Sequence, residues 1–544
     1  MEALGELGIT DVVFALEHPA DLAHGDVATN VAMIGAKKSG KNPRALAEEI
    51  VSLLKKKNDE HIAEITIAGP GFINFTFSKK YFTKALAEAL EKAENFGRNK
   101  MLEGKKVIVE YTDPNPFKEF HIGHLMANAI GESISRLVEA SGAETKRACY
   151  QGDVGLHVAT AIWAIQKSNS EDWEELLLRG KAYATGAKAY KEDEQAKKEI
   201  QEINKKLYHR SDEALNTQYD QGRANSLALF AKMYQRLSTK FDFYFFESKT
   251  GEFGKKVVEA HPEIFVASDG AIVYKGDESK GLHTRVFINK EGLPTYEAKE
   301  LGLSKIKYDT SPYDVSIIIT ANEVNDYFKV LLDAMSKVFP NLAATTEHYS
   351  HGMLRLPTGK MSSRTGDVIT ATWLLDEAKA EIKRSVTDTT EEVAEAAAVA
   401  AVKYSILRQS KGKDIIFDFA QSLSFEGDSG PYLQYTHART CSLLAKAGGK
   451  KSDVRVIGNG EISPLHKYLL RFPEIVVRAE EERAPHHVAT YLIEVAREFN
   501  SFYGNTMILD GAPDEGYKLA LVMLTRNVLQ QGLWLLGISA PSRM

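Results

Sequence analysis

The sequence predicts a multidomain α/β protein with a parallel sheet at its centre and a helical region at its C-terminal end. Three observations indicate this. The chain has 544 residues, too many for one hydrophobic core, so two to four domains are expected. From about residue 105 the pattern alternates between strand and helix, which is typical of a parallel sheet. After about residue 370 the pattern is almost wholly helical.

Composition narrows the class of protein. Apolar residues make up 44% and charged residues 26%, as in ordinary soluble globular proteins. There is no run of eighteen uncharged apolar residues, and the N-terminus lacks the pattern of a signal peptide, so we expect neither a membrane span nor secretion. Two cysteines cannot build a disulfide framework or a cysteine-rich zinc site, which favours the cytoplasm. With a net charge of −6, any binding of RNA must be local.

Residues 1–95 are predicted to form a small α/β module with an exit helix. The segment 42–57 has apolar residues at helical spacing, and 64–78 alternates like a pair of strands turned at "GPG". The segment 79–97 reads as a helix that leads out of the module, and Gly97 suits its C-terminal cap.

Residues 96–380 are predicted to form a second domain that begins with a βαβ unit. "KVIVEY" is followed by a loop, an amphipathic helix and the strand "ETKRACYQGD". Residues 168–222 are helical and rich in lysine and glutamate, and we expect a solvated helical insertion there. Strand-like segments return at "AIVYKG", "HTRVFIN" and "DVSIIIT". Residues 381–544 complete the chain as a helical bundle.

The loop "PNPFKEFHIGHL", residues 114–125, carries the first chemical signal. It follows the first strand of the βαβ unit, so His121 and His124 lie on the first turn of the next helix. A helix N-terminus presents free N–H groups and a positive dipole, which suit a phosphate. Gly123 leaves room for a nucleotide to approach the backbone. A metal pair and ordinary surface histidines remain alternatives.

A second signal is "GKMSSRTGD", residues 359–367, a loop with Lys360 and Arg364 that leads into a helix. Such a loop can close its cations over a triphosphate. Taken alone, however, such a loop is more often an ordinary serine-rich surface turn.

H-I-G-H after a first strand, with K-M-S-S-R later in the domain, resembles the class I aminoacyl-tRNA synthetases, and the ordered motifs of the whole chain resemble the arginyl-tRNA synthetase family. "HGDVATNVAM" and "AGPGFINF" are similar to its N-terminal tRNA-binding module. "VEYTDPNPFKEFHIGHL" is similar to its first catalytic motif, and "SLSFEGDSGPYLQYTHAR" to the start of its anticodon-binding domain. The resemblance therefore implies a Rossmann-like catalytic core between two tRNA-binding regions.

The resemblance implies an arginine–tRNA ligase, which activates L-arginine with ATP and transfers it to the 3′ end of tRNA(Arg). It implies catalytic roles for Lys118, His121, His124 and Lys360. It implies that ATP, carried with Mg²⁺, also meets Gly123, Met361 and Ser362. No tightly bound cofactor and no metal held by the protein are expected, and the family's usual state is a monomer.

A departure from the family pattern in the second motif suggests a specific role for Lys118. The class I loop is K-M-S-K-S, and Ser363 stands here in place of its second lysine. Arginyl enzymes without that lysine resemble this chain in carrying one just before the H-I-G-H, where Lys118 stands. We therefore expect Lys118 to supply the missing charge.

For arginine itself the resemblance points to Glu110, Asn115, Tyr296 and Glu300, with Asp153 of "QGDVGLH" lining the cleft. Carboxylates can grip a guanidinium bidentately, although an ordinary ion pair also explains Glu110 and Glu300. Three positions depart from the family. Glu300 replaces an aspartate, and Val324 and Tyr327 occupy a region where glutamine and histidine are common.

Contacts with tRNA are also implied by the resemblance. Two residues of the N-terminal module correspond to positions near the tRNA elbow, and four C-terminal residues correspond to positions near the anticodon loop. Aromatic faces among them can stack on unpaired bases, while core packing is the alternative for each tyrosine. These six residues are Phe72, Asn74, Tyr432, Tyr435, Tyr503 and Met544.

Three other functions fit the sequence less well. A class I ligase for cysteine would bring zinc ligands that two isolated cysteines cannot provide. A ligase that joins an amino acid to a small thiol would not need the two tRNA-binding ends. A non-catalytic RNA-binding relative would show a broken H-I-G-H or lost lysines, whereas Lys118, His121, His124 and Lys360 are all present.

Overall fold

The structure is a computed structural model that describes residues 1–544 except 20, 169–179, 357–368, 388, 451 and 457–461. The chain forms two compact units. One contains Met1–Phe96, Arg439–Pro473 and Glu494–Val528, and the other contains Gly97–Ala438, Glu474–Ile493 and Leu529–Met544.

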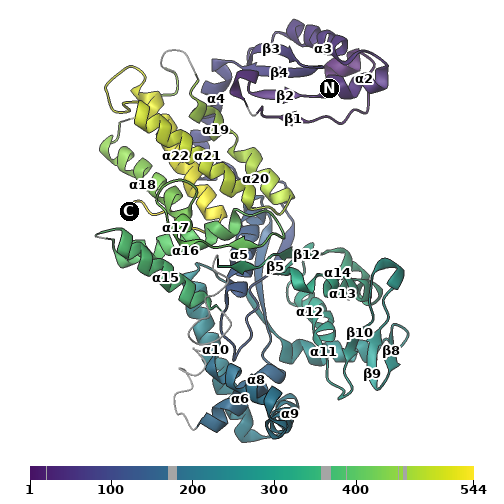
Figure 1. Cartoon of the computed structure of the whole chain (residues 1–544). Helices are drawn as coiled ribbons and strands as arrows, with labels where there is room; N and C mark the ends of the chain where they lie inside the picture. Colours follow the sequence, from purple (N-terminus) through teal and green to yellow (C-terminus); the bar gives the residue numbers. More distant parts are fainter. Residues whose placement is uncertain (20, 169–179, 357–368, 388, 451, 457–461) are drawn as a thin grey trace. The chain divides into compact units, whose positions relative to one another are not determined.

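The larger unit is organised by a five-stranded sheet, visible in Figure 1, in which every neighbouring pair is parallel. The strand order is β12-β11-β5-β6-β7. From β5 the chain builds outward to β6 and β7, and it later returns to add β11 on the other side of β5. This reversal creates a crevice at the carboxyl ends of β5 and β11, where open α/β sheets bind ligands. The strands are β5 (Lys106–Glu110), β6 (Glu144–Gln151), β7 (Phe243–Phe246), β11 (Val315–Ala321) and β12 (Thr346–His351).

Helix α5 (Ile122–Ala140) crosses from β5 to β6 and is buried along almost its whole length. Its buried polar side chains are satisfied by specific partners. Glu132 accepts hydrogen bonds from the Tyr111 hydroxyl at 2.6 Å and from Arg136 Nε at 2.7 Å. Arg136 in turn donates to the carbonyl of Trp534 at 2.8 Å. These bonds join the helix that begins with the H-I-G-H residues to the C-terminal end of the chain.

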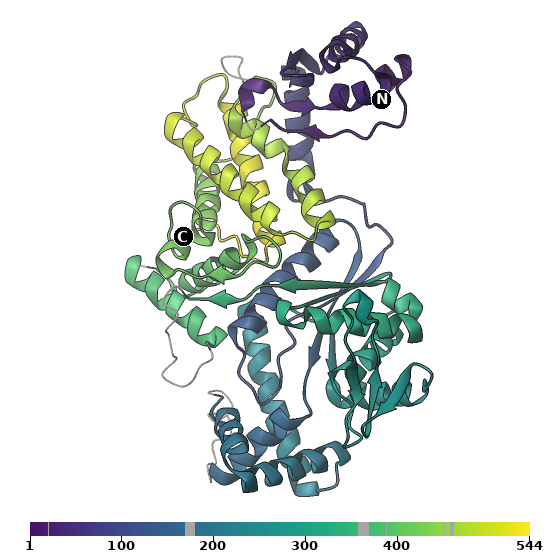
Figure 2. The same cartoon turned by 45° about the vertical axis from the view of Figure 1, so that its right-hand side comes forward.

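The connection between β6 and β7 is the helical insertion, and it extends beyond the predicted 168–222. Helices α6, α8 and α9 gather in one cluster, as Figure 2 shows, and they share a buried apolar core. The insertion is therefore not only a solvated face. Its helices are α6 (Leu156–Ser168), α8 (Lys181–Glu192), α9 (Glu194–His209) and α10 (Glu213–Arg236).

The connection between β7 and β11 is a second module with its own antiparallel sheet, in the order β10-β9-β8. The strand-like segments "AIVYKG" and "HTRVFIN" belong to this small sheet, and only "DVSIIIT" joins the parallel one. Apolar side chains of both sheets share a core with α12 and α13. The elements are α11 (Glu247–Glu259), β8 (Phe265–Ser268), β9 (Ala271–Tyr274), β10 (Arg285–Ile288), α12 (Tyr296–Thr310), α13 (Asn325–Val338) and α14 (Pro340–Ala344).

The region after residue 370 is helical, as predicted. The alanine-rich α16 (Glu391–Leu407) is buried from Ala397 to its end, since small side chains allow its neighbours to approach closely. A short parallel pair, β13 (Leu354–Arg355) and β14 (Ile415–Ile416), ties this region to the end of the sheet domain. The other helices are α15 (Ala371–Ser385), α17 (Phe419–Ser422), α18 (Gly430–Lys446), α19 (Pro464–Leu470), α20 (Phe472–Glu481), α21 (His486–Asn505) and α22 (Glu515–Leu535).

The N-terminal module, in the other unit, has a four-stranded antiparallel sheet in the order β1-β2-β4-β3. Its exit helix, α4, ends at Lys92 and not at the predicted Gly97. Ala93 has a positive φ of 47°, and a short 3₁₀ turn carries the chain to Gly97, whose φ is 101°. The elements are α1 (Glu2–Glu6), β1 (Leu16–Glu17), β2 (Val27–Thr29), α2 (Val31–Ser39), α3 (Pro43–Lys57), β3 (Ile62–Ala68), β4 (Phe72–Phe77) and α4 (Lys79–Lys92).

Candidate active site

The loop between β5 and α5 is held in a strained conformation. Thr112, Asp113 and Phe117 all have positive φ, at 82°, 46° and 67°. A β-branched residue rarely adopts such a φ, and strain of this kind clusters at functional sites. The surrounding structure fixes it, because Asn128 donates to the Thr112 hydroxyl at 3.0 Å and the Phe117 N–H donates to Ser226 Oγ at 3.0 Å.

The two histidines of the motif cap the helix that they begin. His121 is the N-cap of α5, and its Nδ1 accepts the N–H of Gly123 at 3.1 Å. His124 Nδ1 accepts the N–H of His121 at 3.2 Å. The rings stack with centroids 3.7 Å apart and an angle of 18° between planes. Because each Nδ1 is an acceptor, the proton of each neutral ring lies on Nε2, which remains a donor.

Both imidazoles are neutral at physiological pH. Burial, and then the charge of Lys118, lowers the pKa of His121 to about 4. The pKa of His124 lies well below its ordinary value because of burial, His121 and Lys118. Gly123 is required by this arrangement, since a Cβ there would lie 2.9 Å from His121 Cε1. The motif therefore offers two neutral N–H donors rather than two cations.

A cavity of about 1040 Å³ opens at the carboxyl ends of β5 and β11. His121, Gly123 and His124 form one side of it, together with Thr112 and Asp113, and Thr320 and Ala321 at the end of β11 form another. The cavity thus lies at the point where the strand order reverses, as expected for a nucleotide site in this fold.

Lys360, Met361, Ser362 and Ser363 lie outside the described residues, which stop at Leu356 and resume at Ile369. Both of these flanking residues line the cavity. The chain that follows is bonded to the first motif, since the Ile122 N–H donates to the Ile369 carbonyl at 3.1 Å and the Ala371 N–H donates to the Phe120 carbonyl at 2.9 Å. The described residues that directly follow the second motif in the sequence are therefore bonded to the first motif.

A buried acidic cluster lies beyond this cavity, where β5 ends. Glu110 is 1% exposed and forms an ion pair of 2.6 Å with the buried Lys307. Burial and the charge of Glu110 raise the pKa of Glu300 well above its ordinary range, and the same two causes raise the pKa of Asp113. The charge of Lys307 lowers the pKa of both groups but does not outweigh these two causes. Lys307 pairs with Glu110, whereas Glu300 and Asp113 form no ion pair among the described residues.

A second buried ion pair borders the cluster. Lys299 Nζ lies 2.6 Å from Glu247 Oε2, and both side chains are 6% exposed. Asn115 packs closely against the β6 turn, because a Cβ on Gly152 would lie 2.1 Å from Asn115 Oδ1 and 3.2 Å from Glu247 Oε1. Asn115, Glu247 and Lys299 therefore form one wall of the region where Glu110 and Glu300 lie.

Asp153 is fully buried, and both of its oxygens are engaged by the chain. Oδ2 accepts from Tyr219, Arg223 and the Ser248 hydroxyl, and Oδ1 accepts from the Ser248 N–H, all at 2.8–3.1 Å. This geometry favours a role in holding the insertion and α11 around the site, rather than direct contact with a ligand.

Two tyrosines near the acidic cluster differ in their exposure to solvent. Tyr296, the first residue of α12, is 60% exposed and lies 5.3 Å from Lys299 Nζ, measured to its ring centroid. Tyr327 has a buried hydroxyl with no hydrogen-bond partner among the described residues. The charges that most affect this hydroxyl are those of Glu300, Glu297 and Glu247. Tyr327, predicted as a departure from the family, therefore has a hydroxyl that is unpaired among the described residues and is affected by the charges of the acidic cluster.

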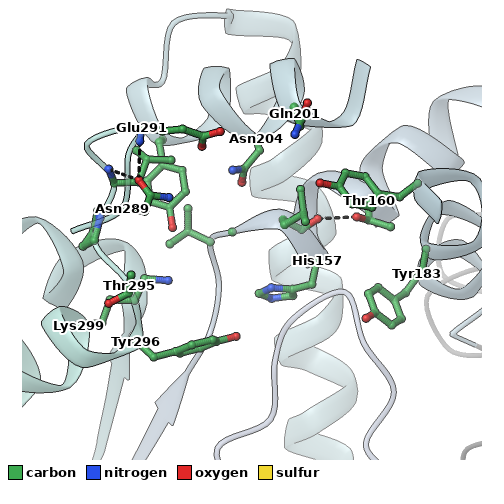
Figure 3. Close-up of a pocket in the computed structure, with 18 of the residues that line it drawn as sticks. His157, Thr160, Tyr183, Gln201, Asn204, Asn289, Glu291, Thr295, Tyr296 and Lys299 are labelled. Carbon is green, nitrogen blue, oxygen red and sulfur yellow. Dashed lines mark hydrogen bonds between the residues drawn. The ribbon is translucent and has the colours of Figure 1, made fainter. Parts of the chain in front are cut away.

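Lys118 stands between this region and a second cavity of about 560 Å³. Its ammonium lies 4.7 Å from the centroid of the Tyr183 ring, and burial lowers its pKa. Figure 3 shows the second cavity with Tyr296 and Lys299 of α12 on one side and His157 and Asn204 of the insertion on the others.

The residues predicted to contact tRNA differ in exposure. Phe72, Tyr435 and Tyr503 are 39–40% exposed, so their rings are accessible. Asn74 is only 7% exposed, and Tyr432 is half-buried. Met544 packs against the apolar core between α15 and α16. Exposure therefore favours three of the six as contacts.

The structure adds site residues that the sequence pattern did not identify. Lys307 lies 197 positions after its partner Glu110, and Lys299 lies 52 positions after Glu247. Both lysines are on α12, which has many charged residues, so the sequence does not distinguish them from lysines that face solvent. The one available signal is their spacing of eight positions, which places them close to the same face of the helix.

Comparisons with known proteins agree with this geometry. Three family models match in order: "Arginyl tRNA synthetase N terminal domain" at residues 1–77, "tRNA synthetases class I (R), catalytic domain" at 85–419, and "DALR anticodon binding domain" at 433–544. With the parallel sheet and the capped histidine pair, these matches define a class I aminoacyl-tRNA ligase. More particularly, the chain belongs to the arginyl-tRNA synthetase family.

Individual relatives cover nearly the whole chain. The arginine–tRNA ligase of Fusobacterium nucleatum is 32% identical over 96% of this chain and 93% of its own length. That of Thermococcus sibiricus is 30% identical over 100% and 97%. Among solved structures, the Thermus thermophilus arginyl-tRNA synthetase matches with a TM-score of 0.80 and 25% identity over 100% of this chain and 98% of that one.

No described helix has the length and apolar character needed to cross a membrane. Within the same residues, no group of three or more His, Cys, Asp and Glu side chains is placed to hold a metal ion.

Proposed function

We propose that this arginine–tRNA ligase carries out both half-reactions in the larger unit, with the residues described above. It uses ATP to activate L-arginine as arginyl-adenylate with release of pyrophosphate, and it then esterifies the 3′ end of tRNA(Arg). The observation that carries the assignment of the site is that the neutral histidine pair follows β5 and a buried acidic cluster lies where β5 ends, and that Glu300 of this cluster has no ion pair among the described residues.

ATP is proposed to bind in the larger cavity, with its Mg²⁺ as part of the substrate. His121 and His124 donate Nε2–H groups to phosphate oxygens, and Gly123 allows the backbone to approach. In-line attack by the arginine carboxylate places negative charge on the α-phosphate oxygens, and preorganised donors stabilise such charge. Lys360, Met361 and Ser362 are proposed to complete the site, supported by the flanking residues Leu356 and Ile369, which line the same cavity.

Lys118 is proposed to supply the cation that Ser363 lacks. Its charge acts on both His121 and His124, because it lowers the pKa of each. A cation beside two neutral donors is the arrangement that a developing phosphoryl charge requires.

Arginine is proposed to place its guanidinium in the acidic cluster. Glu110 is held by Lys307, so Glu300 is the carboxylate with capacity for a new cation. Tyr327 offers a hydroxyl to the guanidinium from the other side, and Tyr296 and Asn115 stand nearer to the reacting end. A site built of such hydrogen-bonding groups rejects an analogue that leaves them unpaired by roughly 10⁴–10⁵.

The 3′ end of tRNA is proposed to enter the second cavity. Tyrosine faces there can stack on bases, and lysines can meet phosphates. Lys118 lines this cavity and approaches the histidine pair, so an ester formed at this point would lie next to the adenylate.

Other assignments are proposals of the same kind. The domains are 1–95, 96–380 and 381–544, supported by the order of the three family matches. The chain is proposed to act as a cytoplasmic monomer. Contacts near the tRNA elbow are proposed for Phe72 and Asn74, and contacts near the anticodon for Tyr432, Tyr435, Tyr503 and Met544. Asp153 is proposed as a positioning residue for the arginine site.

The experiment that tests the function is ATP–pyrophosphate exchange with each amino acid, with and without tRNA. We expect exchange with arginine alone among the amino acids, and greater exchange when tRNA is present. Exchange with another amino acid would contradict the specificity. Binding of tRNA without exchange would indicate a non-catalytic relative.

A further inference from the structure

One polar atom in the second cavity has no partner. Asn204 is on α9, and its Oδ1 is buried without a hydrogen bond among the described residues. Figure 3 shows this side chain directed into the open space between the insertion and α12. A buried acceptor left without a donor costs stability, and native structures rarely tolerate it without a reason. The atom therefore points to a ligand.

Other polar residues around the same space are engaged by the chain itself. The Thr160 hydroxyl donates to the Leu156 carbonyl at 2.6 Å, and His157 Nε2 lies 2.8 Å from the Gly152 carbonyl. Asn289 Oδ1 accepts the N–H groups of Glu291 and Leu293 at 3.0 and 2.9 Å. These groups shape the cavity, whereas the Asn204 amide is available to recognise what enters it.

The chemistry of the cavity suits a nucleobase. Its volume of about 560 Å³ lies within the range of about 300–1,000 Å³ that is usual for small-ligand sites. Tyr183, Tyr190 and Tyr208 line it, and aromatic faces stack on bases. Lys118 and Lys191 also line it and can meet phosphate oxygens. An amide presents an acceptor beside a donor, and adenine presents an amino donor beside a ring-nitrogen acceptor.

We propose that Asn204 recognises the adenine of the 3′-terminal nucleotide of tRNA. Its Oδ1 accepts from the exocyclic amino group, and its Nδ2 donates to the adjacent ring nitrogen. Guanine presents an oxygen in place of that amino group, so it would meet the Asn204 acceptor with a second acceptor. The inference rests on the proposed function of this cavity, and it gives the helical insertion a role in substrate choice.

The test uses tRNA that ends in adenosine or in purine riboside, which lacks only the amino group. We expect the wild-type enzyme to lose about tenfold in kcat/KM for arginylation when the amino group is absent. Asn204→Ala should lose about tenfold with adenosine and nothing further with purine riboside. Asn204→Asp, which keeps an acceptor, should remain sensitive to the amino group. This difference between variants is one that a merely structural role would not produce.

Asn225→Ala is the matched control. Asn225 is on α10, pairs with Gln221 and does not line the cavity. It should discriminate between the two tRNAs as the wild type does. Because the adenine of ATP has the same edge, a second arm replaces ATP by the triphosphate of purine riboside, and Asn204→Ala should respond to that change as the wild type does.

Three results would overturn the inference. The wild type could charge both tRNAs equally, Asn204→Ala could discriminate as strongly as the wild type, or the effect of Asn204 could follow the triphosphate and not the tRNA. Failure of the wild type to arginylate unmodified tRNA is a different result, because it would contradict the proposed function and with it the inference.

Discussion

At the residue scale, the histidine pair separates two tasks that the proposed phosphate site requires. Each Nδ1 is used to cap α5, and burial keeps both rings neutral, with the pKa of His121 at about 4. Neutral rings can donate Nε2–H groups but bring no charge. The positive charge near them must therefore come from other residues, and Lys118 is the described lysine whose charge acts on both rings.

Removal of the Lys118 ammonium should slow the formation of arginyl-adenylate. Lys118→Ala is expected to lower the single-turnover rate by about 10²–10³, since loss of one preorganised donor raises a barrier by about 2.7–4 kcal/mol. Lys118→Arg should retain part of the rate because the charge remains. Rapid quench with excess enzyme, ATP and arginine measures this step.

Lys205→Ala is the control for this prediction, because Lys205 is an exposed lysine of α9. It should leave both the rate and the melting temperature unchanged. If Lys118→Ala forms adenylate at the wild-type rate, Lys118 does not serve the phosphate site.

The raised pKa of Glu300 leads to a prediction of how arginine binding depends on pH. Burial and Glu110 raise its pKa well above 4.5, so the carboxyl holds its proton until the pH exceeds that raised value. A guanidinium prefers the ionised form. Arginine affinity should therefore increase with pH above 4.5 and level off once Glu300 ionises. The measurement is the KM for arginine as a function of pH, with the KM for ATP followed alongside.

Glu300→Gln isolates this effect. It keeps the size of the side chain and cannot ionise, so its KM for arginine should be high and nearly independent of pH over the same window. An unchanged pH profile in this variant would assign the titration to another group, such as Asp113, whose pKa is also raised.

The sequence was sufficient for part of the site. Spacing alone places His121 and His124 on one helical turn after a strand, and the structure confirms that placement. It could not show that Glu110 is already paired, because Lys307 meets it only after α12 packs against the sheet. Nor could it show that the Asp153 oxygens are consumed by Tyr219, Arg223 and Ser248, since that depends on how the insertion folds back.

At the element scale, α5 connects the proposed phosphate site to the C-terminal end of the chain. Its first turn carries the histidine pair, and its later turns bind the end of α22 through Arg136 and through Ser133, whose hydroxyl donates to the Leu535 carbonyl at 2.8 Å. Lys403 of α16 completes the junction. It is fully buried and donates to the carbonyls of Leu237 and Gly537 at 2.6 and 2.7 Å.

The lowered pKa of Lys403 predicts that the stability of the protein depends on pH. Burial, and then the charge of Arg136, lowers its pKa from 10.5 to about 7, although Glu132 opposes this. Between these two values the unfolded chain carries a proton that the folded chain does not. This difference in bound protons makes the free energy of unfolding increase with pH above about 7, by at most about 1.4 kcal/mol per pH unit.

Lys403→Met removes this dependence and leaves two buried carbonyls without their donor, at a cost of about 1–3 kcal/mol each. Its melting temperature should be lower than that of the wild type, and the gap should be wider at pH 9 than at pH 7. Lys413→Met, at an exposed lysine, should show no gap at either pH. A constant gap for Lys403→Met would mean that Lys403 stays charged in the folded protein.

The strands and helix ends show which features the sequence pattern predicts and which depend on tertiary packing. The strands "KVIVEY" and "DVSIIIT" have buried apolar runs and join the parallel sheet. "AIVYKG" and "HTRVFIN" have similar composition but pair antiparallel with each other, which strand pattern alone does not distinguish. The exit helix stops at Lys92 because Ala93 has a positive φ. Alanine rarely adopts such a φ, so its presence in the sequence does not predict a helix end.

At the scale of the whole molecule, a chain of net charge −6 must hold a polyanion. Bulk attraction is absent, so affinity depends on local contacts, in which stacking contributes without releasing counterions. Phe72 of β4 is 39% exposed in the N-terminal module and offers such a contact. Phe75, on the same strand, instead packs against the core of that module.

Phe72→Ala should therefore raise the KM for tRNA by about 5- to 150-fold, corresponding to about 1–3 kcal/mol of stacking. The KM values for arginine and ATP should not change, and neither should the slope of log KM for tRNA against log salt, because no phosphate contact is lost. Phe75→Ala is the matched control, expected to lower the melting temperature because it empties a packed site. A shallower salt slope in Phe72→Ala would mean that the ring positions a cation on the phosphates, and an unchanged KM would remove Phe72 from the tRNA-binding surface.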